Sequence, residues 1–575
     1  MEGLEVTVLL GLTILAGTLL APRIRVALPL VLVVFGLLLG FVPQLREVQL
    51  PPETVLLLFL PVMLFWESLT TSLRSIRRDF RYILPMSTLL VVASAFAVAG
   101  VGVLFGMPWE IALILGAAVA PPDATAVAAL GRLLPRRMFM KLKAESLTND
   151  GTALVLYAIA ISLAVGGDVT PLSITWTVLV SYVGGVLAGA VIAALAYLLL
   201  RRSTSTAVIN VTLLLVPFTA FLLAEIMHAS GVLAVVVAGL VIAYVSPRIT
   251  TASSRRQSEA AFPFGVYLLN GALFVLIGLE VQYVVHEISA AAVGRLVLIT
   301  LGVWVALLAV RYLFQLLSAV VRRPTDARPP RSLAARVRLL STFAGMRGAV
   351  SLAIALSIPV EIGGEGRDEV VVVTAGVILL SLLVQGPLLP AVVRWAKLPV
   401  DTAEVEEYEL AERTISGAAL AALDDLAAEH GVGQEILDRV RSEGYLMLEY
   451  ANARALAREQ AAVDAEASAL DAMLDEPDPY GGGSAGLELV EQREDAVDGS
   501  SLQIIATSTA VDVAQRSPLI RHEEHTRLKL ALLDRKREVL LGLRRSGTVD
   551  DVVVRRISAR LDLEQVRLQG IEEFD

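Results

Sequence analysis

Residues 144–157 read AESLTNDGTALVLY, and this stretch decides how the rest of the chain must be organised. Its second half is apolar enough for a membrane, yet its first half carries two acids, Glu145 and Asp150, among polar residues. Ionisable groups at membrane depth are costly, so they are functional candidates. On a helix, Ser146 and Asp150 lie on one face, and Glu145 and Asn149 lie on a neighbouring face. The two acids are therefore expected to have different roles, with ion pairing between helices as the alternative for either.

The composition is that of a membrane protein. Hydrophobic residues make up 55% of the 575 residues and the mean hydropathy is +0.69, which is more than a soluble domain hides in its core. The lack of cysteine excludes disulfides and Cys-ligated metals, and five scattered histidines form no metal motif. We expect no cofactor and no enzymatic activity. The net charge of −9 comes largely from the C-terminal part and does not indicate a nucleic-acid partner.

Apolar stretches long enough to span a membrane recur along residues 1–398. They predict an all-α, polytopic protein of about thirteen transmembrane helices, followed by a cytoplasmic helical domain over residues 399–575. The expected spans are 4–21, 25–43, 51–68, 82–106, 109–130, 143–166, 171–200, 205–228, 230–246, 262–284, 294–321, 336–358 and 369–395.

Basic residues fall in alternate loops between these spans, and the intervening loops carry almost none. The positive-inside rule then predicts an N-terminus outside the cell and a cytoplasmic C-terminus, in a multi-pass protein of the plasma membrane. Acids precede the first apolar run and arginines follow it, which is the reverse of a cleavable signal peptide.

Two spans are interrupted. The fifth contains AVAPPDATAV (118–127), in which a proline pair breaks the helix beside Asp123. The twelfth contains FAGMRGAVSLA (343–353), in which two glycines flank Arg347. If the fourth to sixth spans and the eleventh to thirteenth spans are two copies of one structural repeat, each break lies in the middle helix of its three-helix group. Matched broken helices are typical of secondary transporters built from inverted repeats.

From Pro399 the sequence becomes acidic and rich in alanine, and helical patterns replace membrane spans. This region contains no phosphate loop, nucleophile motif or metal constellation, so we interpret it as a regulatory or dimer-stabilising tail. Helices are expected at about 402–430, 434–474, 519–545 and 547–570, with the Gly- and Pro-rich loop PDPYGGGSAG after the second.

The polar groups within the spans suggest a cation site. Hard monovalent cations prefer carboxylate, hydroxyl and carbonyl oxygens. Asp150, Ser146, Asp123 and Glu67 could supply such oxygens, together with a main-chain carbonyl freed at the proline break. Because burial disfavours a charged carboxylate, Asp150 could hold either a proton or a cation. A carrier that crosses with one or the other is an exchanger, and the neutral amide of Asn149 favours one cation for one proton.

The arginines within the spans need partners. Arg311 lies in an apolar run and is costly unless paired, so Glu145, on the face away from Asp150, is its expected partner. Arg347 at the second break is placed to balance the exposed carbonyl ends of half-helices. Glu67 and Glu225 lie near the ends of their spans, and the alternative for both is that they face water.

PPDATAV, ESLTNDGTALVLY, FVLIGLE (274–280) and GMRGAVSLA (345–353) occur in this order. Together they resemble the monovalent cation/proton antiporters of the NhaP and NHE kind, the CPA1 family, over about residues 1–398. The resemblance implies a homodimer of thirteen-helix subunits, in which the fifth and twelfth helices cross where they unwind. It implies Asp150 as the ion and proton carrier.

The same resemblance implies roles for the neighbouring residues. Ser146, Asp123 and Glu67 would assist Asp150 in binding Na+, Asn149 would support the site, and Glu145 and Arg311 would form a structural ion pair. The family usually has Thr-Asp in the fifth helix, whereas this chain has Pro122 before the aspartate. Only the main-chain carbonyl of Pro122 can replace the missing hydroxyl.

The predicted function is therefore Na+/H+ antiport by alternating access, with electroneutral one-for-one exchange, for pH and sodium homeostasis. The expected partners are a monovalent cation, membrane lipid and a second copy of the chain, with no nucleic acid. K+/H+ antiport is the alternative within the same class, since both cations use the same oxygens. A cation channel is the alternative from another class; it would need a continuous pore and would show no proton coupling.

Overall fold

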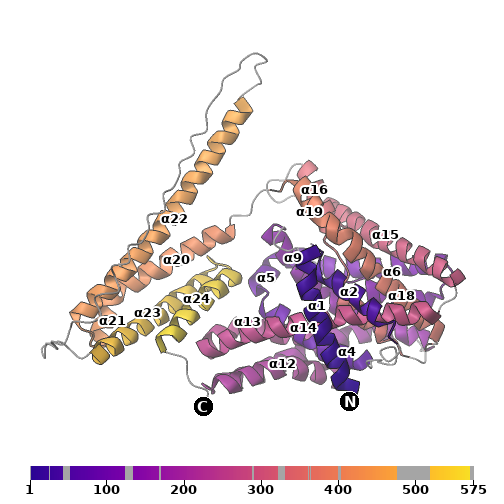
Figure 1. Ribbon diagram of the computed structural model, residues 1–575, viewed down its shortest axis with the longest axis horizontal. Coiled ribbons are helices and arrows are strands. Elements are labelled where there is room, and N and C mark those ends of the chain that lie inside the picture. The colour runs from indigo at the N-terminus through magenta and orange to yellow at the C-terminus, as the bar shows by residue number, and fades with distance from the viewer. Residues whose placement is uncertain are drawn as a thin grey trace. The chain divides into compact units, whose positions relative to one another are not determined.

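The computed structural model describes residues 2–24, 26–42, 52–123, 134–166, 170–287, 290–321, 331–359, 362, 364–398, 403–474 and 518–569. All regular elements in these ranges are helices (Figure 1). The chain forms two compact units. The membrane unit comprises Met1–Thr402 with Asp550–Arg555, and the tail unit comprises Ala403–Val549 with Arg556–Asp575.

The helices of residues 1–398 correspond to the thirteen expected spans. Nine helical segments within the described residues are long and apolar enough to cross a membrane, and three shorter apolar helices add to them. The remaining expected span, 336–358, is divided between two short helices. The elements are α1 (Glu2–Ile24), α2 (Leu28–Leu39), α4 (Pro52–Leu69), α5 (Leu73–Ser87), α6 (Leu89–Leu104), α7 (Trp109–Val119), α9 (Arg136–Ala164), α10 (Pro171–Leu179), η2 (Val180–Gly184), α11 (Gly185–Leu200), α12 (Thr206–Ile226), α13 (Gly231–Ile249), α14 (Ala252–Glu287), α15 (Ala290–Val321), α16 (Arg331–Phe343), α17 (Ala349–Leu356), α18 (Gly364–Leu380), η4 (Ser381–Gln385) and α19 (Gly386–Ala396).

The outer helices of the membrane unit expose apolar side chains, as a lipid-facing surface requires. Leu195 and Leu198 on α11, Leu215 on α12 and Leu317 on α15 are each at least 44% exposed. A water-soluble fold would bury such residues, so their exposure agrees with a bilayer environment for this unit.

Small residues let the helices of the membrane unit approach closely. The pair Gly36 of α2 and Gly278 of α14 is the clearest example, because a side chain on either would collide with the backbone of the other helix. In lipid there is little hydrophobic drive between helices, so close backbone packing of this kind supplies much of the association energy.

Two large buried apolar clusters and one small cluster lie within the membrane unit, and α9 contributes to all three. Ala153 and Ala160 belong to one large cluster, whereas Leu147 belongs to the other, with residues of α4 and α13. The helix ends near Gly166, whose positive φ of 82° is accessible to glycine without strain. The stretch with the two acids thus lies on a helix shared by both parts of the core.

The C-terminal region is helical as expected, with one correction. The single helix expected over 402–430 is interrupted at Ala422, giving two helices in place of one. Asp424 and Asp425 lie in the first turn of the second helix. Acidic side chains stabilise the N-terminus of a helix, so these residues favour the start of a new helix at this point. The elements are α20 (Ala403–Ala421), α21 (Leu423–Glu429), α22 (Gln434–Leu474), α23 (Pro518–Ser546) and α24 (Asp551–Gln569). The expected loop at 477–486 lies outside the described residues.

Candidate functional site

The two interrupted spans meet at their breaks. The backbone N–H of Asp123, just beyond the end of α7, donates to the carbonyl of Met346 between α16 and α17 at 2.8 Å. Gly348 faces Asp123 so closely that a Cβ at this position would overlap the carboxylate. Both glycines predicted to matter at the second break therefore have a packing reason, since a Cβ at Gly345 would lie 2.8 Å from the Nε atom of Arg311. The second half of the fifth span, 124–130, lies outside the described residues.

Arg347 connects the second break to the first. Its guanidinium donates to the carbonyl of Ala120, the residue that caps the C-terminal end of α7. The last carbonyls of a helix carry partial negative charge and have no partner in the helix itself. The side chain is only 3% exposed, so this arginine neutralises a helix end inside the protein, as its position in the sequence predicts.

The four residues expected to bind the ion lie around one cavity. Glu67 of α4, Asp123 of the first break, and Ser146 and Asp150 of α9 all line it, together with apolar side chains of α4, α14 and α17. Its volume of about 20 Å³ is space for roughly one to two water molecules. A single monovalent cation, with most of its hydration shell replaced by protein oxygens, fits this size.

The site is shielded from water and rich in acidic side chains. Asp123, Ser146 and Asp150 are between 4% and 6% exposed. Within the described ranges no three acidic or histidine side chains are gathered tightly enough to hold a resident metal ion. Glu67, Asp123 and Asp150 instead lie around the cavity.

Asn149 connects α9 to the first break. Its amide Nδ2 donates to the carbonyl of Pro122 at 3.1 Å, and the residue is fully buried. The supporting role implied for Asn149 thus has a geometric basis. The Pro122 carbonyl, proposed as a replacement ligand, is not among the groups that line the cavity, and one of its two lone pairs is taken by this hydrogen bond.

Glu145 faces away from the cavity and pairs with Arg311 of α15. The two groups form a bidentate contact, with Nη1 to Oε1 at 2.5 Å and Nη2 to Oε2 at 3.0 Å. The arginine Nε also donates to the carbonyl of Ser341 in α16 at 3.0 Å. Both charged side chains are at most 3% exposed, so this pair joins α9, α15 and α16 inside the membrane unit.

Lys143 is a neighbour of the site that the sequence pattern did not single out. Its ammonium donates to the hydroxyl of Thr70 at 2.7 Å, three residues beyond Glu67. Lys143 precedes Ser146 and Asp150 by three and seven residues, so it lies on the same face of α9, and this spacing could have identified it. Glu225 is exposed near the end of α12, which agrees with the expectation that it faces water.

Comparisons with known proteins show relatives over most of the chain. The chain is 36% identical to an uncharacterized Na+/H+ exchanger of Mycobacterium tuberculosis, over 98% of this chain and 96% of the relative. It is 30% identical to the Na+/H+ antiporter ApNhaP of Aphanothece halophytica, over 69% of this chain and 75% of that protein.

A solved structure has the same fold. The sodium proton antiporter MjNhaP1 of Methanocaldococcus jannaschii superposes with a TM-score of 0.55 at 17% identity, over 70% of this chain and all of that one. The family model of the transmembrane sodium/hydrogen exchangers matches residues 10–395, which include both breaks and the whole of the cavity. The chain therefore belongs to the sodium/hydrogen exchanger family.

Proposed function

We propose that the chain is a secondary antiporter that exchanges Na+ for H+ across the cell membrane by alternating access. The observation that carries this proposal is the cavity shared by Glu67, Asp123, Ser146 and Asp150 at the contact of two broken helices. A buried acidic cavity of one-ion size binds a cation by its oxygens and a proton by its carboxylates. These two ligands exclude each other there.

Coupling follows from this exclusion. When a cation occupies the cavity, the negative charge of Asp150 is balanced and the carboxylate holds no proton. When the cation leaves, a proton restores neutrality, because a bare carboxylate at this depth is costly. The protein then switches between its outward-open and inward-open states only when Asp150 is neutralised by a cation or a proton. Each turnover therefore moves one cation in one direction and one proton in the other.

Sodium is the favoured cation, since the relatives described above are named Na+/H+ exchangers and antiporters. The deciding experiment uses purified protein in liposomes that hold a pH-sensitive dye and an imposed pH gradient. Na+, Li+ and K+ are added in turn. Proton efflux that follows Na+ supports the proposal, and efflux with K+ alone selects the K+/H+ alternative. Cation flux without proton movement points to a channel and overturns antiport.

Orientation and assembly are further parts of this proposal. The alternation of basic loops supports an outside N-terminus and a cytoplasmic C-terminus. Family membership supports a homodimer. Labelling of single cysteines introduced into the cysteine-free chain tests the orientation, and mass measurement in native detergent complexes tests the dimer.

A further inference from the structure

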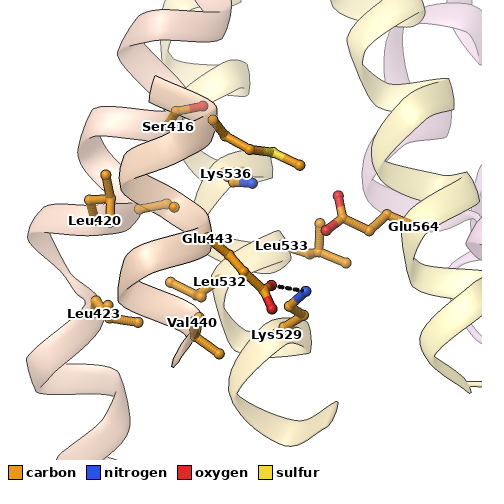
Figure 2. Close-up of a pocket in the computed structure, with 13 residues that line it drawn as sticks. Ser416, Leu420, Leu423, Val440, Glu443, Lys529, Leu532, Leu533, Lys536 and Glu564 are labelled. Carbon is orange, nitrogen blue, oxygen red and sulfur yellow. Dashed lines mark ion pairs between the residues drawn. The ribbon is translucent and has the colours of Figure 1, made fainter. Parts of the chain in front are cut away.

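The tail unit contains a cavity that the exchange reaction does not use. Residues of α20, α21, α22 and α23 line it, with Glu564 of α24 at its edge (Figure 2). Its volume is about 70 Å³, space for roughly five water molecules. A molecule with about six non-hydrogen atoms, such as a small amino acid, has this size.

Most of the lining is apolar. Leu420 and Leu423 lie on one side, and Leu532 and Leu533 of α23 lie on another (Figure 2). Leu423 and Val440 of this lining belong to a buried apolar cluster formed by α21, α22 and α23, so the wall is part of a packed core. Such a wall accommodates the hydrocarbon part of a ligand, and the polar groups in the lining determine how that ligand is oriented.

Four charged side chains interrupt the apolar lining, and they fall into two classes. Lys529 and Glu443 satisfy each other through an ion pair of 2.7 Å, which Figure 2 marks. Lys536 of α23 and Glu564 attract each other electrostatically, but within the described part of the chain neither forms a direct ion pair or a side-chain hydrogen bond. The lining thus holds one cation and one anion that do not form a direct ion-pair contact.

This arrangement is costly for the tail unit by itself. Burial lowers the pKa of Lys536, and the neighbouring Glu564 only partly opposes this effect. Lys536 therefore loses hydration in this lining, and no carboxylate of the described residues lies within direct ion-pair distance to replace it. A ligand that supplies the missing charge on each side would remove this cost.

We propose that this cavity binds a small zwitterionic amino acid, with its carboxylate on Lys536, its ammonium on Glu564 and its side chain against Leu420 and Leu533. A simple carboxylate would satisfy Lys536 but would leave Glu564 unpaired beside a second negative charge. A simple amine would satisfy Glu564 but would leave Lys536 without a partner beside a second positive charge. A zwitterion matches both groups, and it leaves the total charge of the cavity unchanged.

Isothermal titration calorimetry of the full chain in detergent tests the proposal. The probes are L-alanine, butyrate as a carboxylate alone and n-propylamine as an amine alone. We expect saturable binding of alanine, and binding at least about tenfold weaker for each singly charged probe, since each lacks one charge-assisted hydrogen bond. Butyrate or propylamine binding as tightly as alanine would overturn the zwitterion assignment, and so would the lack of saturable alanine binding.

Substitutions locate the binding. Lys536→Met and Glu564→Gln should each weaken alanine binding by about tenfold. Arg535→Gln is the matched control, because it removes a positive charge from the neighbouring position of α23, where the side chain is exposed and pairs with Glu538. Ser416→Leu, which narrows the cavity without touching either charge, should also abolish binding. Alanine binding that survives Lys536→Met and Ser416→Leu would place it elsewhere and refute the proposal.

Discussion

Asp150 and Glu145 are five residues apart on one helix and have opposite surroundings. Glu145 is fixed by two charge-assisted hydrogen bonds to Arg311, whereas Asp150 opens onto a cavity of one-ion size. A carboxylate held by a buried guanidinium cannot exchange its partner cheaply. The carboxylate at the cavity is the one that can gain and lose a cation or a proton.

Replacement of Asp150 by asparagine should abolish exchange while the protein stays folded. An amide has the same shape, but it neither releases a proton nor balances a cation. The measurement is Na+-driven proton flux in liposomes, with Glu225→Gln as the control because that exposed acid lies outside the cavity. Flux at the wild-type rate in the Asp150→Asn variant would refute the role of Asp150 as carrier.

Removal of Glu145 should affect stability more than chemistry. In Glu145→Ala, Arg311 is left as a buried charge without its partner, and breaking such a pair costs about 3–5 kcal/mol. Thermal unfolding in detergent measures the loss. The double variant Glu145→Ala with Arg311→Leu should recover part of it, since no uncompensated charge remains. Equal melting temperatures for Glu145→Ala and wild type would contradict the ion pair.

At the scale of elements, the two broken helices act as one structural piece. Asp123 donates its backbone N–H to Met346, and Arg347 donates back to Ala120. The break of each span therefore supplies a hydrogen-bond partner for the break of the other. This reciprocity explains how irregular backbone persists at membrane depth, where no water is available to satisfy it.

Gly348→Ala should impair ion binding by displacing Asp123. The added methyl group would overlap the Asp123 carboxylate, which lines the cavity. We expect a rise of about tenfold or more in the Na+ concentration for half-maximal flux, from a loss of about 1–3 kcal/mol by overpacking. Gly265→Ala is the control, since no atom lies near its Cβ position. Unchanged Na+ dependence in Gly348→Ala would show that the close contact does not matter.

In the tail unit, the contact between α22 and α23 should weaken in acid. A hydrogen bond from Lys529 is the main cause of the lowered pKa of Glu443. Because the pKa of Glu443 is lower in the folded state, its ionised carboxylate stabilises the fold at pH values above the ordinary Glu pKa of 4.5. This stabilisation is lost as the pH falls through the pKa that Glu443 has in the folded state.

Hydrogen exchange of α22 and α23 peptides in the full chain measures this effect. Glu443→Gln should exchange faster than wild type at neutral pH, and the difference should shrink as the pH approaches and passes below the Glu range. Glu429→Gln, which changes an acid outside this contact, serves as the control. A difference that grows in acid would have the wrong sign and would exclude the Lys529 contact as its cause.

At the scale of the whole molecule, the charge carried in each half-cycle determines the response to voltage. Asn149 is bound to the Pro122 carbonyl and is neutral, so it adds no proton to the cycle. If Asp150 alone exchanges one cation for one proton, each half-cycle carries the same charge. The exchanger then moves no net charge across the membrane.

The transport rate should accordingly be independent of an imposed membrane potential. Moving one unit charge through 100 mV is worth about 2.3 kcal/mol, so an electrogenic cycle would respond strongly. Na+-driven proton flux is measured in liposomes whose potential is clamped by valinomycin and K+, after transport of K+ by the protein itself has been checked. A severalfold change with the sign of the potential would require a second proton site, at Asp123 or Glu67.

Much of this architecture follows from local sequence. Apolar runs of membrane length located the spans, because hydropathy and helix rise are local properties. The proline pair and the glycines around Arg347 located the breaks, since both residue types act on their own backbone. The different surroundings of Glu145 and Asp150 followed from the turn of about 100° per residue in a helix. The helix division at Ala422 was missed, because no proline or glycine marks it.

Only the tertiary structure decided which groups meet. Glu145 and Arg311 are 166 residues apart in the sequence. The spacing of apolar residues predicts the helices, but it does not predict which helices pack against one another. The contact of Lys143 with Thr70, the hydrogen bond from Asn149 to Pro122 and the size of the ion cavity depend likewise on how helices pack. Sequence therefore determined the helices, their breaks and the polar face of α9. Packing determined the cavity, because its walls come from α4, α9, α14 and α17 and exist only where those helices converge.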